Sequence, residues 1–378
     1  MKILICSGCF ETKSVGAAHF PNYALKINQL YPNHDVKILT TDTKQSYDKV
    51  IKLKTKSYYI PKAFNFIKLN FAFYRHIKKI ISTEALDLIV VNHPLNAILV
   101  GLRLSNKIKI GVVVHDDYSA PISHIKNFSF RHRIVYGIKK YLEQIILKKF
   151  DVILCPSNYI KKYLEPFVND STKVELLYQA IDVKKIVFSN PQPINPTSIK
   201  ILFVKTSYVR GGLFDLIDAI AILKNYNFQL TIVGDMKNVD TEIINDAASN
   251  ISNVNFVFKY FQEEAYISKL MYENDILCVP SREEVLGLAN VEGLAHGIRV
   301  VSTKVGGIPE VLDSGKNGWL AEPNNPISLA QVLENCIEEG PSVFEAKSEV
   351  GRRFVEEHFD YRSMISRFVE ISENVINK

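Results

Sequence analysis

Short apolar runs that alternate with helical patterns occur twice along this chain of 378 residues. The first set reads KILIC, DVKILTT, LDLIVVN, IKIGVVV and DVILCPS, and the second reads IKILFV, QLTIVGD, NVNFVFK, DILCVPS and RVVST. Continuous apolar runs between helices indicate parallel strands that are covered on both faces. Residues 190–198, NPQPINPTS, contain three prolines and separate the two sets. The sequence therefore predicts two α/β domains joined by a short linker.

In residues 280–297, PSREEVLGLANVEGLAHG, the glutamates Glu284 and Glu292 have seven residues between them. The pattern predicts a strand, a loop that carries Glu284, a turn over Gly287, Leu288 and Ala289, and a helix that carries Glu292. Free N–H groups at a helix N-terminus bind phosphate, and carboxylates accept hydrogen bonds from sugar hydroxyls. The spacing suits a nucleoside diphosphate-sugar. Glutamates that only stabilise the helix dipole or face solvent would fit it too.

Residues 298–323, IRVVSTKVGGIPEVLDSGKNGWLAEP, predict another apolar strand, a Gly306-Gly307 turn and a short helix starting near Pro309. Together the two blocks resemble the retaining GT-B glycosyltransferases of family 4 (glycosyl transferases group 1). That family reads P-S-x-x-E-G-F-G-L-x-x-x-E-A-x-A-x-G, then an apolar strand, then G-G-x-x-E. The chain departs from it at 285–286 and 293–294, which are packing positions, and keeps both glutamates.

The resemblance implies the GT-B fold, in which two Rossmann-like domains of the α/β class face each other across a cleft. We expect an acceptor-side domain over residues 1–189 and a donor-binding domain over 199–355. A C-terminal helix over 356–378 is expected to cross back to the N-terminal domain, because Phe359-Asp360-Tyr361 fits the family's F-x-Y signal.

Residues 203–212, FVKTSYVRGG, stand where the family reads V-G-R-x4-K-G, with Arg and Lys holding the diphosphate. Lys205 and Arg210 are each shifted by one position from those cations. Lysine and arginine differ in geometry, so a different loop could restore the clamp or phosphate could bind more weakly. Solvated surface charges are the remaining interpretation.

Two further candidates follow strands of the first domain. His115, in VVVHDDYSAP, stands where the family has a histidine that contacts the donor sugar, although a turn capped by the next aspartate would explain the same residues. Gly16 would let the backbone approach a phosphate, or would be an ordinary turn glycine.

The resemblance implies transfer of a hexose from a UDP- or GDP-sugar to a hydroxyl of a glycan or lipid-linked acceptor. Retention of anomeric configuration, independence of metals and other cofactors, and a role in cell-surface polysaccharide assembly are expected. Glu284 and His115 would hold the sugar, Glu292 the ribose, and Lys205 and Arg210 the diphosphate. A GT-B nucleotide-sugar epimerase or phosphorylase is the alternative. A nucleic-acid-binding protein is less favoured, because it would leave the donor block unexplained.

The charge of the chain is uneven. Residues 1–190 contain 29 lysines and arginines against 14 acidic residues, whereas the remainder contains 17 against 26. The basic half predicts attachment to an anionic membrane surface, or an anionic soluble acceptor. Segment 56–79 interleaves lysines with aromatic residues and suits a membrane interface or an acceptor groove. A helix over 131–149 is expected to pack its apolar residues, Ile134, Ile138, Tyr141, Leu142 and Ile145, against the core.

The five cysteines are mostly far apart, and no signal peptide or stretch of about 18 apolar residues is present. We therefore expect a cytoplasmic protein that attaches peripherally to the inner face of the cell membrane and binds no nucleic acid.

Overall fold

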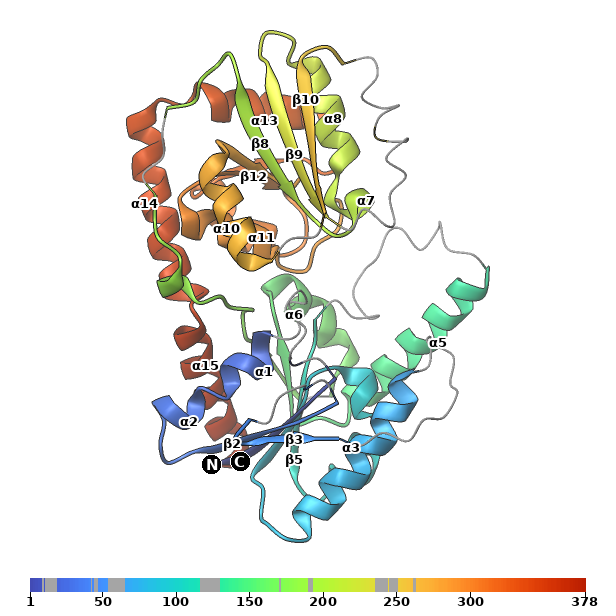
Figure 1. The fold of residues 1–378 in the computed structure, drawn as a ribbon. Coiled ribbons are helices and arrows are strands. Elements are labelled where there is room, and N and C mark those ends of the chain that lie inside the picture. The colour runs from blue at the N-terminus through green and yellow to red at the C-terminus, as the bar shows by residue number, and fades with distance from the viewer. Residues whose placement is uncertain are drawn as a thin grey trace. The chain divides into compact units, whose positions relative to one another are not determined.

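The computed structural model describes residues 1–8, 10, 19–41, 43, 47–53, 65–115, 130–169, 171–189, 193–234, 244, 251–260 and 263–378. These residues form two compact units, which we call the N-terminal unit (Met1–Ala180 with Tyr361–Lys378) and the C-terminal unit (Ile181–Asp360). Figure 1 shows the elements of both. The N-terminal unit ends before the proline-rich linker, and the last helix of the chain belongs to it.

The N-terminal unit is built on a parallel sheet in the order β3-β2-β1-β4-β5-β6-β7. Its strands are β1 (Lys2–Ser7), β2 (Asp35–Thr40), β3 (Val50–Lys52), β4 (Leu88–Val91), β5 (Lys109–Val113), β6 (Val152–Cys155) and β7 (Lys173–Leu176). Strands β4 and β6 are buried throughout, as their unbroken apolar runs predict. The strand order reverses between β1 and β4, and in such sheets ligands bind beyond the carboxyl ends of the strands at that point.

The helices of this unit are α1 (His19–Ala24), α2 (Ile27–Leu30), α3 (Asn65–Ile81), α4 (Ile98–Leu104), α5 (Phe130–Leu147), α6 (Asn158–Leu164) and α15 (Tyr361–Ile376), with 3-10 turns η3 (Pro94–Ala97) and η5 (Glu165–Phe167). Helix α15 shares the hydrophobic core with β1 and α1. The ring of Phe368 packs edge-on against Phe20 at 5.2 Å, and Tyr361 stacks on Tyr23 at 4.9 Å. These aromatic contacts hold the C-terminal helix on the N-terminal unit.

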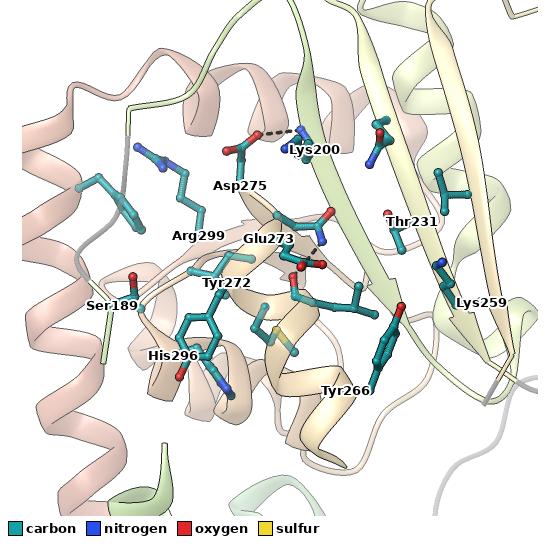
Figure 2. A pocket seen from close by; sticks show the side chains of 18 residues that line it. Ser189, Lys200, Thr231, Lys259, Tyr266, Tyr272, Glu273, Asp275, His296 and Arg299 are labelled. Atoms are coloured by element: carbon teal, nitrogen blue, oxygen red, sulfur yellow. Dashed lines mark hydrogen bonds between the residues drawn. The ribbon is translucent and has the colours of Figure 1, made fainter. Parts of the chain in front are cut away.

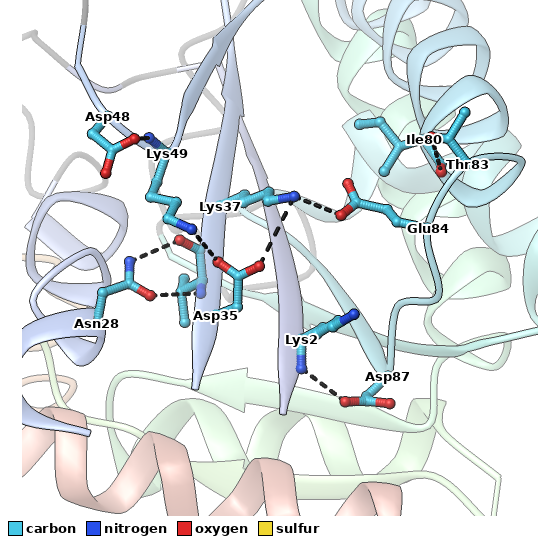
Figure 3. A network of polar contacts seen from close by, with 11 residues as sticks. Lys2, Asn28, Asp35, Lys37, Asp48, Lys49, Ile80, Thr83, Glu84 and Asp87 are labelled. Atoms are coloured by element: carbon cyan, nitrogen blue, oxygen red, sulfur yellow. Dashed lines mark hydrogen bonds and ion pairs between the residues drawn. The ribbon is translucent and has the colours of Figure 1, made fainter. Parts of the chain in front are cut away.

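Charged side chains link the amino ends of this sheet (Figure 3). Lys49 lies 2.9 Å from Asp35 at the start of β2, and Lys37 lies 2.5 Å from Glu84. The backbone N–H of Lys2 donates to Asp87 at 2.7 Å. Part of the positive charge of this unit is therefore neutralised at the sheet edge opposite to the carboxyl ends.

The C-terminal unit is built on a second parallel sheet in the order β10-β9-β8-β11-β12-β13. Its strands are β8 (Ile199–Val204), β9 (Phe228–Gly234), β10 (Val254–Tyr260), β11 (Ile276–Cys278), β12 (Arg299–Thr303) and β13 (Trp319–Ala321). Its helices are α7 (Tyr208–Gly211), α8 (Leu213–Ile222), α10 (Glu264–Glu273), α11 (Leu288–His296), α12 (Ile308–Val311), α13 (Pro326–Glu338) and α14 (Pro341–His358), with 3-10 turns η6 (Val183–Lys185) and η8 (Asp313–Gly315). The prediction of two Rossmann-like domains is confirmed.

Helix α5 contradicts the sequence interpretation. The expected core residues Ile134, Ile138, Tyr141 and Ile145 are exposed, and the buried face carries Tyr136, Glu143 and Ile146 instead. The periodicity located an amphipathic helix but assigned the wrong face to the core, because the polar Glu143 is fully buried. On α3, Phe73 is buried and Phe71 is exposed, so the aromatic residues of segment 56–79 do divide between core and surface; residues 56–64 lie outside the described part.

Candidate active site

Three loops meet at the carboxyl edge of the second sheet, because β8, β11 and β12 are neighbours in it. The loop after β8 leads into α7, the loop after β11 leads into α11, and the loop after β12 leads into α12. The N–H of Arg282 donates to the carbonyl of Arg210 at 2.8 Å, and Thr303 Oγ1 donates to the carbonyl of Ser281 at 2.5 Å. These bonds tie the middle loop to both of its neighbours.

Two glycines allow the close approach of these loops. Gly306 has a φ of 58°, and a Cβ there would lie 1.7 Å from the carbonyl oxygen of Glu284. Gly212 has a φ of 75°, and its Cβ would lie 2.0 Å from the carbonyl oxygen of Pro280. Both conditions, the left-handed backbone and the absence of space, require glycine. The Gly306-Gly307 turn therefore positions the backbone of Glu284.

The two cations expected at the diphosphate both lie beside acidic residues of the middle loop. Lys205 Nζ forms an ion pair with Glu284 Oε2, and both side chains are mostly buried, with exposed fractions of 22% and 15%. Arg210 Nε lies 3.8 Å from Glu283 Oε2. The structure thus brings Lys205 and Glu284 together, and it places Arg210 beside a glutamate that sequence reasoning did not single out.

A second ion pair supports this loop. Arg282 Nε and Nη2 donate to the two carboxylate oxygens of Asp215 at 2.7 and 2.6 Å, and Asp215 is buried in the first turn of α8. This bidentate geometry is the strongest form of the pair. It holds the start of α8 against the loop that carries Glu284.

Helix α11 follows the loop that carries Glu284, as predicted, but it begins at Leu288, so Leu288 and Ala289 of the predicted turn belong to the helix and Gly287 precedes it. Gly287 has a φ of 97° and supplies no side-chain cap, so the first N–H groups of the helix are available to an anion. Glu292 follows on the same helix and is half-buried. Burial, helped by the nearby Glu264 carboxylate, raises the pKa of Glu292 from 4.5 to about 7. A carboxylate held in this way gains from a ligand that donates hydrogen bonds to it.

This pKa gives a test that needs no substrate. Between pH 4.5 and 7 the folded protein keeps a proton on Glu292 that the unfolded chain has lost. The free energy of unfolding therefore falls as the pH rises through this window, by up to about 3 kcal/mol. We expect thermal unfolding to show that the stability of Glu292→Gln, relative to wild type, increases from pH 5 to pH 8. A difference that does not change with pH would contradict the raised pKa.

His296 lies four residues after Glu292, at the C-terminal end of α11, and its side chain is held by hydrogen bonds to α11 and α10. Its Nδ1 bonds the carbonyl of Glu292 at 2.7 Å, and its Nε2 bonds Ser268 Oγ at 2.7 Å. Burial lowers its pKa, which favours the neutral ring. Within the described part of the chain, no group of three or more His, Cys, Asp and Glu side chains is arranged to hold a metal ion.

A hollow of about 620 Å³ in the C-terminal unit lies elsewhere (Figure 2). Lys200, Asp275 and Arg299 stand at or just before the starts of β8, β11 and β12, so the hollow lies at the amino edge of the sheet. None of the predicted donor-binding residues that the structure describes lines it. The candidate site is therefore the group of loops at the opposite edge of the sheet, and not this hollow.

In the N-terminal unit, His115 lies just after β5 and is buried, with 7% of its surface exposed. Its Nε2 lies 2.7 Å from Asn92 Oδ1, and its Nδ1 lies 3.1 Å from the amide nitrogen of Gln179. Asn92 also donates to Ser7 Oγ at 3.0 Å. Nε2 therefore carries the ring proton and Nδ1 accepts, so the ring is held in one orientation at the carboxyl edge of the sheet.

This network is the main feature that the residue patterns did not predict. Asn92 and Ser7 each end an apolar strand run, and that position is a detectable signal; Gln179 follows no such run. Gly16 lies outside the described residues. Both ring nitrogens of His115 already have partners, so contact with a sugar requires one of these bonds to be exchanged.

Two family models match the chain. The model of glycosyl transferases group 1 matches residues 185–352, and that of glycosyltransferase family 4 matches residues 28–185. The chain belongs to the group 1 glycosyltransferases.

The curated relatives of this glycosyltransferase include an uncharacterized glycosyltransferase from Methanocaldococcus jannaschii, 29% identical over 70% of this chain and 69% of the relative. Among solved structures it is similar to sucrose-phosphate synthase from Thermosynechococcus elongatus, with a TM-score of 0.78 and 18% identity over the whole of both chains. It is also similar to HepE from Anabaena in complex with UDP-glucose, with a TM-score of 0.72 and 17% identity over 99% of this chain and 100% of that one. The fold is GT-B, as the sequence resemblance implied.

Proposed function

We propose that this glycosyltransferase transfers a hexose from a UDP- or GDP-sugar to a hydroxyl with retention of anomeric configuration. The observation that carries the proposal is the ion pair of Lys205 with Glu284. It forms at the segments that follow β8, β11 and β12, each of which contains a glycine with positive φ, next to the start of α11. The lysine and the N–H groups at the helix N-terminus would bind the negatively charged diphosphate, and the carboxylate would accept hydrogen bonds from the sugar hydroxyls. The complex of HepE with UDP-glucose makes UDP-glucose a natural first donor to test.

In the proposed reaction the bond between the anomeric carbon and the diphosphate oxygen breaks, and a bond to the acceptor oxygen forms on the same face of the sugar. The departing phosphate takes the proton of the acceptor hydroxyl. Lys205, Arg210 and the first N–H groups of α11 stabilise the negative charge that develops on the diphosphate. Because these groups supply positive charge, we propose that the reaction needs no metal ion.

The remaining residues bind the parts of the donor. Glu284 and His115 hold the sugar, and Glu292 accepts hydrogen bonds from the ribose hydroxyls. Ribose binding favours the ionised carboxylate, so the affinity for nucleotide rises with pH through the pKa of about 7. For Gly16 the proposal rests on the sequence alone: a glycine at this position would let the backbone approach a phosphate.

The proposed acceptor is a glycan or a lipid-linked glycan at the inner face of the cell membrane, used in cell-surface polysaccharide assembly. The basic character of residues 1–190 supports an anionic surface or acceptor. Among the described residues, no helix combines the length and apolar content needed to cross a membrane. A nucleotide-sugar epimerase or phosphorylase would share the donor site and is distinguished by its product.

A thermal-shift screen with UDP-, GDP- and ADP-sugars tests the proposal. A ligand that binds only the folded state at 100 times its dissociation constant stabilises the protein by about 2.7 kcal/mol. We expect at least one of these donors to raise the melting temperature, and the same donor to yield a glycosylated product. If no nucleotide-sugar shifts the melting temperature at millimolar concentration, the proposed function is wrong.

A further inference from the structure

Helix α5 exposes an apolar stripe. Phe130, Ile134, Ile138, Tyr141 and Ile145 are 78%, 47%, 45%, 64% and 42% exposed. Their spacing of four, four, three and four residues places them on one face of the helix. Single exposed apolar residues are ordinary, but a continuous stripe of five on one helix marks a surface that meets another apolar phase.

The buried face of the same helix is the more polar one. Glu143 is completely buried there, together with Tyr136, Ile146 and Leu147. His93 is half-buried; burial lowers its pKa, and the negative charge of Glu143 acts in the opposite direction. Rolling α5 to bury its apolar stripe would bring Glu143 to the surface and break this arrangement. The outward orientation of the stripe is therefore built into the fold.

The exposed charges of α5 itself have one sign. Glu143 is the one acidic residue in the sequence of α5, and it does not reach the surface. Arg131 and Arg133 are exposed at the start of the helix, and Lys148 and Lys149 are exposed just after its end. Unlike the lysines in Figure 3, these basic side chains border an apolar surface.

Helix α3 adds a second element of the same kind. It packs with α5 against the 3-10 turn η3 and belongs to the same unit. Phe71 is 57% exposed on α3, and Arg75, Lys78 and Lys79 are exposed along the same helix. An apolar face bordered by basic residues is the composition of helices that lie in the plane of an anionic membrane interface.

We propose that α5 docks on an anionic lipid surface, inserting the stripe Phe130–Ile134–Ile138–Tyr141–Ile145 among acyl chains while the flanking basic residues meet lipid phosphates. The single sign of the charge favours lipid over a second copy of this chain, because two copies would bring like-charged borders together. The inference deepens the proposed function by naming the surface where a lipid-linked acceptor is met. It can fail independently, because vesicle binding does not require activity.

Vesicle flotation tests the proposal, with vesicles of phosphatidylcholine alone or mixed with phosphatidylglycerol. We expect wild type to float with the anionic vesicles, and less so at high salt, which screens the basic residues. Ile134→Glu with Ile138→Glu should lower the bound fraction by at least about tenfold. The matched control is Ile327→Glu with Val343→Glu, two exposed apolar positions of the C-terminal unit, which should float like wild type.

Thermal unfolding checks that each variant is folded, and Phe130→Ser with Tyr141→Ser replaces the first pair if it is not. The proposal is overturned if wild type stays unbound at low salt, or if the folded stripe variants float as wild type does. It is also overturned if wild type sediments as a dimer that the stripe variants dissociate and does not bind vesicles. Retained donor binding in a variant that no longer floats would leave the proposed function standing.

Discussion

Replacing Lys205 by methionine is expected to lower kcat/KM by about 100- to 1,000-fold, the effect of removing one group that stabilises negative charge in a transition state. Two causes combine. The diphosphate loses a cation, and Glu284, which Lys205 neutralises in the absence of ligand, is left mostly buried and close to the phosphate. Steady-state kinetics with the donor found by screening measure the loss.

The control is Lys316→Met, because Lys316 forms an exposed ion pair with Asp313 at 3.0 Å in the same unit. Such pairs contribute about 0–1 kcal/mol, so its activity should stay close to wild type. Glu284→Gln is expected to be defective by itself, and the double variant should be less defective than the product of the two single effects. Strictly multiplicative effects would show that the two side chains act separately.

Gly306→Ala is expected to have the largest effect on stability. The new Cβ would overlap the carbonyl oxygen of Glu284 at a backbone φ of 58°. The left-handed backbone costs about 1–2 kcal/mol, and forced overpacking about 1–3 kcal/mol more. Because the loop can relieve the overlap only by moving Glu284, activity should be lost with stability. Denaturant unfolding and kinetics measure the two effects.

Gly137→Ala is the matched control, because a Cβ at Gly137 meets nothing within 4 Å. Gly137 lies inside α5, where alanine is favoured over glycine by about 1 kcal/mol, so this variant should be slightly more stable than wild type. If Gly306→Ala unfolds like wild type and keeps its activity, the close contact between Gly306 and Glu284 does not position the site.

The strands that carry the site were predictable because buried parallel strands are continuous apolar runs. Strands β8, β11 and β12 each lie within such a run. Glycines at positions 212, 287 and 306 mark the turns that follow these strands. The strands β3, β7 and β13 were not predicted, because VIK, KVEL and WLA do not belong to a longer continuous apolar run, as the equally short β4, β6 and β11 do. The break between α1 and α2 also lacks a proline or glycine signal.

The partners of site residues were harder to predict than the residues themselves. The pairing of Lys205 with Glu284 joins positions far apart in sequence, and no local spacing encodes it. In α5 the polar Glu143 is completely buried and the apolar stripe is exposed, which is the opposite of what the apolar periodicity of the helix predicts. Such contacts arise from tertiary packing. Residue patterns predict which face of a regular helix or strand is apolar, but they do not predict which side chains meet in the folded protein.

The most direct test of the central claim is calorimetric titration of a nucleoside diphosphate-sugar into wild type, Lys205→Met and Lys316→Met. The claim is that the loops after β8, β11 and β12 form the donor site. Wild type and Lys316→Met should bind the donor alike, while Lys205→Met should bind at least about tenfold more weakly, the loss of one charge-assisted hydrogen bond. Equal affinity for all three folded proteins would contradict the claim.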